Sequence, residues 1–120
     1  MNIGIVGSKS RKDHESIEDL IGGLPSGIVV VSRGGKKLDE IACQIAKEKG
    51  IETMEMYPYI PPASTSEWEA KRLNLSNIRR FVENTDVIYA FVDPTREGDV
   101  EDLIAIAGKM RIPVEVVEPE

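Results

Sequence analysis

Short apolar runs alternate along this chain with longer segments in which apolar residues recur every three or four positions. The runs are typical of strands, and the three-to-four spacing is typical of amphipathic helices. The runs predict five strands, at residues 3–7, 27–32, 51–57, 86–92 and 112–117. The helical spacing predicts a helix in each interval between them. Ser64 and Glu67 predict a capping box at the start of the third helix, which we expect to run to about Thr85.

This alternation of strand and helix predicts the fold class. It implies an α/β domain with a parallel sheet, right-handed crossovers and helices on both faces, which makes three layers. We expect residues 1–120 to form one such domain, with the five strands in the order 3-2-1-4-5. Strands one and four then diverge at a topological switch point, and ligands in such sheets bind beside it, at the carboxyl ends of the strands.

Three strand-to-helix turns at that edge of the sheet combine small residues with positive charge. Backbone N–H groups at helix starts form anion sites, and the helix dipole favours negative charge there. Cations are unusual at this end of a helix, yet seven of the fifteen Lys and Arg residues lie in these turns. We therefore predict a small phosphorylated ligand, most simply a nucleotide. The candidate ligand-binding residues of the turns are Gly7, Ser8, Lys9, Ser10, Arg11, Ser32, Arg33, Gly34, Gly35, Lys36, Asp39, Asp93, Arg96, Gly98 and Asp99.

Each turn also has a plainer interpretation. Gly7 suits close packing of a helix on a strand as well as the approach of a phosphate. Gly34 and Gly35 are equally compatible with an ordinary turn. Asp99 is a good N-cap residue and Asp102 follows three positions later, so helix capping alone accounts for both. The chain contains neither a G-x-G-x-x-G dinucleotide fingerprint nor a G-x-x-x-x-G-K-[ST] phosphate loop.

The third predicted helix and the segment before it carry further candidates. Arg72 and Asn74 are candidate ligand contacts on the helix. Trp68 is either a packing residue or a ring that stacks on a base. Residues 54–62 are too apolar for a free loop, so we expect them to cover the ligand or to form a subunit contact.

Composition and charge limit the classes of partner. A net charge of −6 makes the chain a poor general binder of nucleic acid or of anionic membranes. The sequence has no signal peptide and no apolar run that could span a bilayer, so we expect a cytoplasmic protein. Cys43 is the single cysteine, which excludes an internal disulfide and fits a buried thiol. No cluster of metal ligands surrounds His14, and the sequence predicts neither a metal site nor a cofactor.

These motifs together resemble those of the SLOG superfamily of Rossmann-like nucleotide-binding proteins. The superfamily includes the lonely-guy phosphoribohydrolases, often described as lysine decarboxylase-like, and the DNA-processing protein A domain. The likeness runs from residues 3–7 to residues 113–117. Residues 32–39 (S-R-G-G-K-K-L-D) are similar to the family's S-G-G-A-x-G-x-D, and residues 72–74 (R-L-N) are similar to its Arg-Asn pair. The resemblance implies a Rossmann-like fold, a nucleotide ligand and a homo-oligomer.

The turn after the fourth strand departs from the phosphoribohydrolase pattern. Those enzymes have P-G-G-x-G-T-x-x-E there, whereas residues 94–102 read P-T-R-E-G-D-V-E-D. Pro94 and Gly98 match, Asp99 replaces the Thr, and Asp102 replaces the catalytic Glu. The shorter carboxylate lies farther from a substrate, and Asp99 repels a phosphate. The resemblance therefore implies binding of a nucleotide more readily than its hydrolysis.

Three functional hypotheses follow. The first is a nucleotide-binding or nucleotide-sensing module in which Arg33 and Arg96 pair with phosphate oxygens. The alternative is an N-glycosidase that releases the base of a nucleoside 5′-monophosphate. In that enzyme Asp102 or Glu101 assists the oxocarbenium-like transition state, and Arg72 binds the phosphate. The third is a DNA-processing-type module that handles single strands, and the acidic balance and few aromatic residues argue against it.

Overall fold

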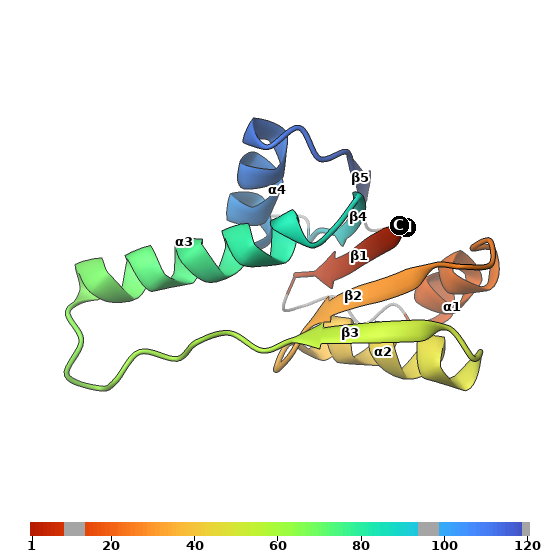
Figure 1. Ribbon diagram of the computed structural model, residues 1–120, viewed down its shortest axis with the longest axis horizontal. Coiled ribbons are helices and arrows are strands. Elements are labelled where there is room, and N and C mark those ends of the chain that lie inside the picture. The colour runs from red at the N-terminus through yellow and green to blue at the C-terminus, as the bar shows by residue number, and fades with distance from the viewer. Residues whose placement is uncertain (9–13, 94–98, 119–120) are drawn as a thin grey trace.

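The computed structural model describes residues 1–8, 14–93 and 99–118, which form a parallel α/β sandwich (Figure 1). The elements in chain order are β1 (Asn2–Gly7), α1 (His14–Gly22), β2 (Val29–Arg33), α2 (Lys37–Glu48), β3 (Glu52–Met56), α3 (Glu67–Glu83), β4 (Val87–Phe91), α4 (Asp99–Lys109) and β5 (Val114–Val117). This alternation is the one that the hydrophobic pattern predicts, and the fold class is confirmed.

The sheet has the predicted strand order, β3-β2-β1-β4-β5. Neighbouring strands pair in parallel throughout the described sheet. β1 lies at the centre, where Ile3 is opposite Val30 of β2 on one side and Val87 of β4 on the other. The carboxyl ends of β1, β2 and β4 therefore meet at one edge of the sheet, and this edge is where ligands of such folds bind.

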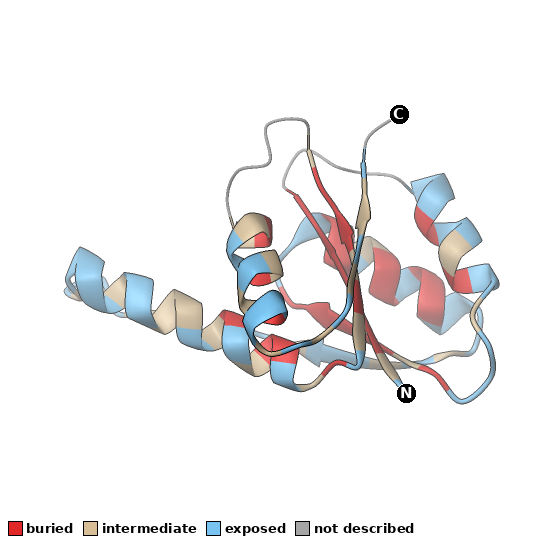
Figure 2. Cartoon of the chain, turned by 90° about the horizontal axis from the view of Figure 1, so that it is seen from above, coloured by how far each residue is buried: buried red, intermediate tan, exposed pale blue. Residues whose placement is uncertain are grey.

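Helices cover both faces of the sheet, and each face has its own core (Figure 2). Ile5 and Val30 belong to the core under α1 and α2, whereas Val6 and Val31 belong to the core under α3 and α4. Successive side chains of a strand point to opposite faces. Because both faces are buried, consecutive positions of β1 and β2 are apolar, and this explains the uninterrupted runs in the sequence.

Two strands start two residues later than the sequence predicts, for reasons that lie in the backbone. Gly27 has a φ of 81°, in the left-handed region, so β2 starts at Val29 and not at residue 27. Pro113 has no N–H to donate to a neighbouring strand, and β5 starts after it, at Val114, and not at residue 112.

The start of α3 also differs from the prediction. The capping box at Ser64 is wrong, because α3 begins at Glu67 and its N-cap is Ser66, whose Oγ accepts a backbone N–H from the first turn at 3.2 Å. The Thr65 N–H donates to the Pro62 carbonyl at 3.0 Å. This bond closes a turn that keeps Ser64 outside the helix.

The two halves of α3 have different surroundings. Ile78, Phe81 and Val82, in the second half, are buried in the core that α3 shares with α4. Residues 67–77 are exposed or partly exposed, and they extend beyond the sheet beside the segment that follows β3 (Figure 1). We call residues 57–76 the arm.

Candidate functional site

The turns after β1 and β4 lie side by side at the switch point. The Ser8 N–H donates to the Phe91 carbonyl at 2.8 Å, and the Ser8 Oγ accepts the Asp93 N–H at 3.2 Å. The predicted residues Ser8 and Asp93 are therefore in contact. The other predicted residues of these turns, Lys9, Ser10, Arg11, Arg96 and Gly98, lie outside the described residues.

Arg33 and Asp39 form a buried ion pair behind the turn after β2. Arg33 Nε donates to Asp39 Oδ2 at 2.8 Å and Nη2 donates to Oδ1 at 3.2 Å. The Arg33 backbone N–H donates to Oδ2 at 3.1 Å, and Nη2 also reaches the Gly7 carbonyl at 3.3 Å. Asp39 is fully buried and Arg33 nearly so. The pair therefore fixes the shape of this turn, and Asp39 acts on a ligand only through Arg33.

Burial and ion pairing have opposite effects on the charge of Asp39. It raises the pKa of Asp39, while the charge of Arg33 and its hydrogen bonds act in the opposite direction. Taking both charges out of water is costly, and the two-pronged geometry offsets that cost. Removing Arg33 would leave the Asp39 carboxyl buried without its partner. Arg33 is for this reason a poor residue with which to probe ligand binding by mutation.

Two glycines allow close packing next to this pair. A Cβ on Gly7 would lie 2.5 Å from Leu38 Cδ1, so the contact between β1 and α2 requires glycine there. A Cβ on Gly34 would overlap the ring of Tyr57, which lies against the turn. The packing interpretation of Gly7 is therefore sufficient to explain it, and Gly34 lets the chain after β3 approach the turn after β2.

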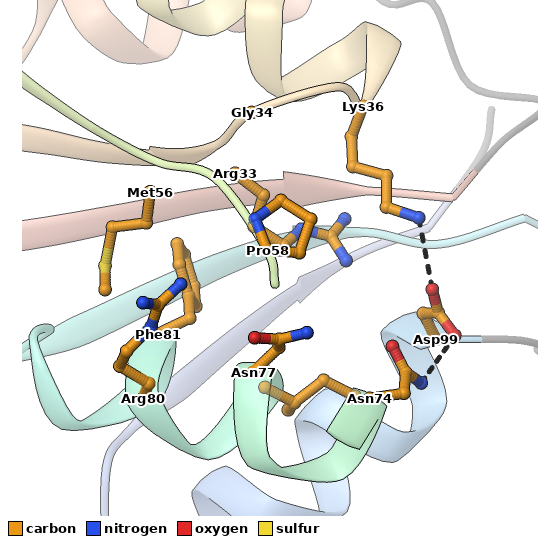
Figure 3. A pocket seen from close by; sticks show the side chains of 11 residues that line it. Arg33, Gly34, Lys36, Met56, Pro58, Asn74, Asn77, Arg80, Phe81 and Asp99 are labelled. Carbon is orange, nitrogen blue, oxygen red and sulfur yellow. Dashed lines mark hydrogen bonds and ion pairs between the residues drawn. The ribbon is translucent and has the colours of Figure 1, made fainter. Parts of the chain in front are cut away.

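A small pocket, with a cavity volume of about 40 Å³, opens to solvent at the carboxyl ends of β2 and β3, between the turn after β2 and α3 (Figure 3). Its lining comes from the end of β2, the end of β3, α3 and the first residue of α4. The lining residues are Arg33, Gly34, Lys36, Met56, Pro58, Asn74, Asn77, Ile78, Arg80, Phe81 and Asp99. The predicted ligand-binding residues among them are Arg33, Gly34, Lys36, Asn74 and Asp99.

One end of the pocket is polar. Lys36 Nζ donates to Asp99 Oδ2 at 3.2 Å, and Asn74 Nδ2 donates to Asp99 Oδ1 at 3.4 Å (Figure 3). Burial raises the pKa of Asp99, but the hydrogen bond and charge of Lys36 and the hydrogen bond of Asn74 lower it overall. The carboxylate is therefore ionised at neutral pH. Asp99 is the first residue of α4 and not the residue before the helix, so the prediction of Asp99 as the N-cap is wrong.

The opposite end of the pocket is apolar and carries one arginine. Met56 and Phe81 lie there with Arg80, and Pro58 lies between the two ends (Figure 3). Arg80 Nη2 donates to the Tyr57 carbonyl at 2.6 Å. Arg80 Nε is buried and has no hydrogen-bond partner among the described residues. An unpaired buried donor costs about 1–3 kcal/mol, so the position of Arg80 carries a local energetic cost.

Pro58 forms part of the pocket wall, and α3 holds residues 57–59 in place. The Tyr59 N–H donates to Asn77 Oδ1 at 3.1 Å, and Asn77 Nδ2 donates to the Tyr59 carbonyl at 3.0 Å. The Arg80 guanidinium lies 4.5 Å from the centroid of the Tyr59 ring. The segment that was expected to cover the ligand or to form a subunit contact thus supplies a pocket wall through Pro58.

Glu55 fixes the start of this wall. Its carboxylate accepts hydrogen bonds from Lys47 at 2.8 Å, from Cys43 at 3.0 Å and from the Tyr57 hydroxyl at 2.8 Å. These donors, Lys47 foremost, lower the pKa of Glu55 to about 2. Cys43 is buried, as predicted, and burial raises the pKa of its thiol. The cluster holds Tyr57 in position beside Gly34.

Several predicted residues are described but are not among the lining residues of this pocket. Arg72 lies instead over the exposed Trp68 ring, 4.8 Å from its centroid. The described residues outside the lining are Gly7, Ser8, Ser32, Gly35, Asp39, Arg72, Asp93, Glu101 and Asp102.

Sequence reasoning missed the part of the lining that α3 and the end of β3 supply. Asn77 and Arg80 follow Asn74 at intervals of three, on the side of the helix that also carries Ile78 and Phe81. Polar residues on the core-facing side of an amphipathic helix are the signal that could have found them.

None of the helices in residues 1–8, 14–93 and 99–118 is long and apolar enough to cross a membrane. Within the same residues, no group of three or more His, Cys, Asp or Glu side chains could hold a metal ion.

Comparison with known proteins supports the fold. No family model matches this chain, and no curated protein matches it. The X-ray structure of DNA processing protein A (DprA) from Streptococcus pneumoniae is similar to it, with a TM-score of 0.58 and 14% sequence identity. The match covers 97% of this chain and 58% of that one, so the chain spans less than two thirds of its neighbour. At this identity the likeness shows a shared Rossmann-like α/β fold and nothing about the site.

Proposed function

We propose that this protein binds, and thereby senses, a nucleotide or nucleotide derivative in the pocket between α3 and the turn after β2. The arrangement of the lining carries the proposal. A polar end lies at the starts of α2 and α4, and an apolar end lies farther along α3 (Figure 3). Small-molecule sites in proteins combine an apolar lining with a few convergent polar groups in this way, and open α/β sheets hold them at the carboxyl edge.

The lining suits a nucleotide in one orientation. Lys36 is the N-cap residue of α2 and makes no side-chain cap, so the first N–H groups of α2 can serve a phosphate, beside the Lys36 ammonium group that also binds Asp99. Asp99 is an acceptor and suits the hydroxyl groups of a sugar. The end formed by Met56 and Phe81 suits the face of a base.

The positions of the acidic residues favour nucleotide binding over enzymatic release of the base. The N-glycosidase hypothesis relies on Glu101 or Asp102, and neither is among the described lining residues. Asp99 lines the pocket, but Lys36 and Asn74 bind both of its oxygens. A carboxylate held in this way orients a ligand and is less suited to assist bond cleavage.

A thermal-shift screen tests the proposal. The purified protein is mixed with nucleoside mono-, di- and triphosphates, cyclic nucleotides and ADP-ribose. A ligand at about 100 times its Kd raises the free energy of unfolding by about 2.7 kcal/mol, which is a clear change in Tm. A selective shift with one class of nucleotide supports the proposal, and the lack of a shift with all of them overturns it.

Lys36→Gln is expected to weaken nucleotide affinity about tenfold or more, because a hydrogen bond to a charged group contributes about 1.5–3 kcal/mol. Isothermal titration calorimetry measures the change. Lys37→Gln is the matched control, since it removes the same charge from the next residue, which is not among the described lining residues. Equal losses in the two variants would mean that general charge, and not this pocket, attracts the ligand.

A further inference from the structure

In its present shape the pocket is too small for a nucleotide. Its cavity volume of about 40 Å³ admits about three water molecules, whereas ligand pockets in proteins have volumes of about 300–1,000 Å³. Pro58 lies between the polar end and the apolar end, in the space that a nucleotide in contact with both ends needs (Figure 3). A nucleotide therefore binds only if part of the pocket wall moves.

The inner part of the wall is fixed by buried contacts. Ile78 and Phe81 belong to the hydrophobic core under α3 and α4. Arg33 is held by two hydrogen bonds from its guanidinium group to the buried carboxylate of Asp39. Movement on this side would break core packing or a buried ion pair, and both are costly.

Residues 57–59 differ from the inner wall because they lie outside the helices and strands. The Gly34 N–H donates to the Met56 carbonyl at 3.0 Å, and β3 ends there. The three residues that follow are exposed, and they belong to neither hydrophobic core of the described chain. Segments with few buried apolar contacts open at a low cost in free energy. The chain can therefore pivot after Met56 while the sheet stays intact.

Hydrogen bonds from nearby side chains hold this segment against the pocket. The Tyr57 hydroxyl donates to Glu55 Oε2 at 2.8 Å, and Arg80 Nη2 donates to the Tyr57 carbonyl at 2.6 Å. Asn77 binds both the N–H and the carbonyl of Tyr59. All of these bonds join exposed groups, so water can replace each of them when the segment moves.

We propose that residues 57–59 form a lid, which Glu55 and Asn77 hold closed, and that a nucleotide binds only after the lid has opened. This inference rests on the proposed function, because it concerns access to the same pocket. Since only the open fraction of the protein binds, the apparent affinity is the intrinsic affinity multiplied by that fraction. A substitution that weakens closure of the lid therefore tightens nucleotide binding.

Tyr57→Phe tests the lid, because it removes the hydroxyl that Glu55 binds and Tyr57 is not among the described lining residues. Each nucleotide of the thermal-shift panel is titrated into the wild type and the variant by calorimetry. The nucleotide that binds is expected to bind Tyr57→Phe about threefold to tenfold more tightly, which is the effect of one net hydrogen bond on an equilibrium. Tyr59→Phe is the matched control, since it removes the hydroxyl of the other exposed ring and leaves the bond to Glu55 in place.

Amide hydrogen exchange tests the lid without any nucleotide. The Tyr59 N–H donates to Asn77, so its exchange requires that bond to open. Its exchange rate is expected to rise about threefold to tenfold in Tyr57→Phe, whereas the amide of Ile5 in β1 keeps its wild-type rate. Gly34→Ala is a second variant, because the added Cβ would overlap the Tyr57 ring. It is expected to raise the rate at Tyr59 as well.

The outcomes separate the lid from the nucleotide site. If no nucleotide of the panel binds either the wild type or Tyr57→Phe, the proposed site and its lid are both overturned. If a nucleotide binds both proteins with equal affinity, or if the exchange rate at Tyr59 is unchanged in both variants, the lid is overturned and the nucleotide site stands.

Discussion

Asp39→Ala is expected to lower the free energy of unfolding by about 3–5 kcal/mol, because it leaves the Arg33 guanidinium buried without its partner. Asp39 is fully buried and accepts three hydrogen bonds from Arg33. The same guanidinium reaches the Gly7 carbonyl, so the loss also loosens the contact between β1 and β2. Urea unfolding monitored by circular dichroism measures the change.

Two comparisons make this result specific. Glu40→Ala removes an exposed carboxylate from the next position of α2 and should change stability by less than about 0.5 kcal/mol. The double variant Arg33→Met with Asp39→Leu removes both charges and should be more stable than Asp39→Ala alone. An Asp39→Ala variant as stable as Glu40→Ala would show that the pair does not hold the turn.

Gly7→Ala is expected to destabilise the protein by about 1–3 kcal/mol, because overpacking of a close contact forces side chains or backbone to move. The added Cβ would lie 2.5 Å from the Leu38 side chain, which is itself buried between α2 and the sheet. Gly7 is the last residue of β1, and its carbonyl accepts a hydrogen bond from Arg33, which lines the pocket. The substitution should therefore lower ligand affinity as well as stability. Chemical unfolding and calorimetric titration of the same preparation measure both.

Gly108→Ala is the matched control, and its effect should have the opposite sign. Gly108 lies near the end of α4, and a Cβ added there would meet nothing within 4 Å. Alanine at an exposed helical position is expected to stabilise by about 0.5–1 kcal/mol relative to glycine. If Gly7→Ala were as stable as wild type, the close packing of β1 on α2 would not be the reason for the glycine.

The strand order could be predicted because each element carries its own local signal. Ile5 and Val6 are both apolar, as are Val30 and Val31, and short apolar runs of this kind are typical of a strand buried on both faces. Alternation with amphipathic helices then leaves few topologies, and the crossover rule selects among them. The errors lie at element ends, such as Ser64, where a single backbone turn decides the boundary.

The site could be predicted only in part, because its contacts join residues that are distant in the sequence. Arg33 follows a strand and precedes two glycines, which is the pattern of a phosphate contact, yet its guanidinium binds Asp39. The contacts of Asn77 and Arg80 with residues 57–59 depend on how the arm folds back on α3. No local pattern in the sequence encodes that path.

Backbone amide chemical shifts, recorded on isotope-labelled protein while a nucleoside monophosphate is added, report where the ligand lies. The nucleotide-binding proposal predicts saturable shifts at Gly34, Lys36 and Asn74, at the carboxyl edge of the sheet. Ser26 and Gly27, at the opposite edge, should not shift. Shifts confined to that opposite edge, or no shifts at the pocket at saturating nucleotide, would contradict the proposal that this pocket is a nucleotide site.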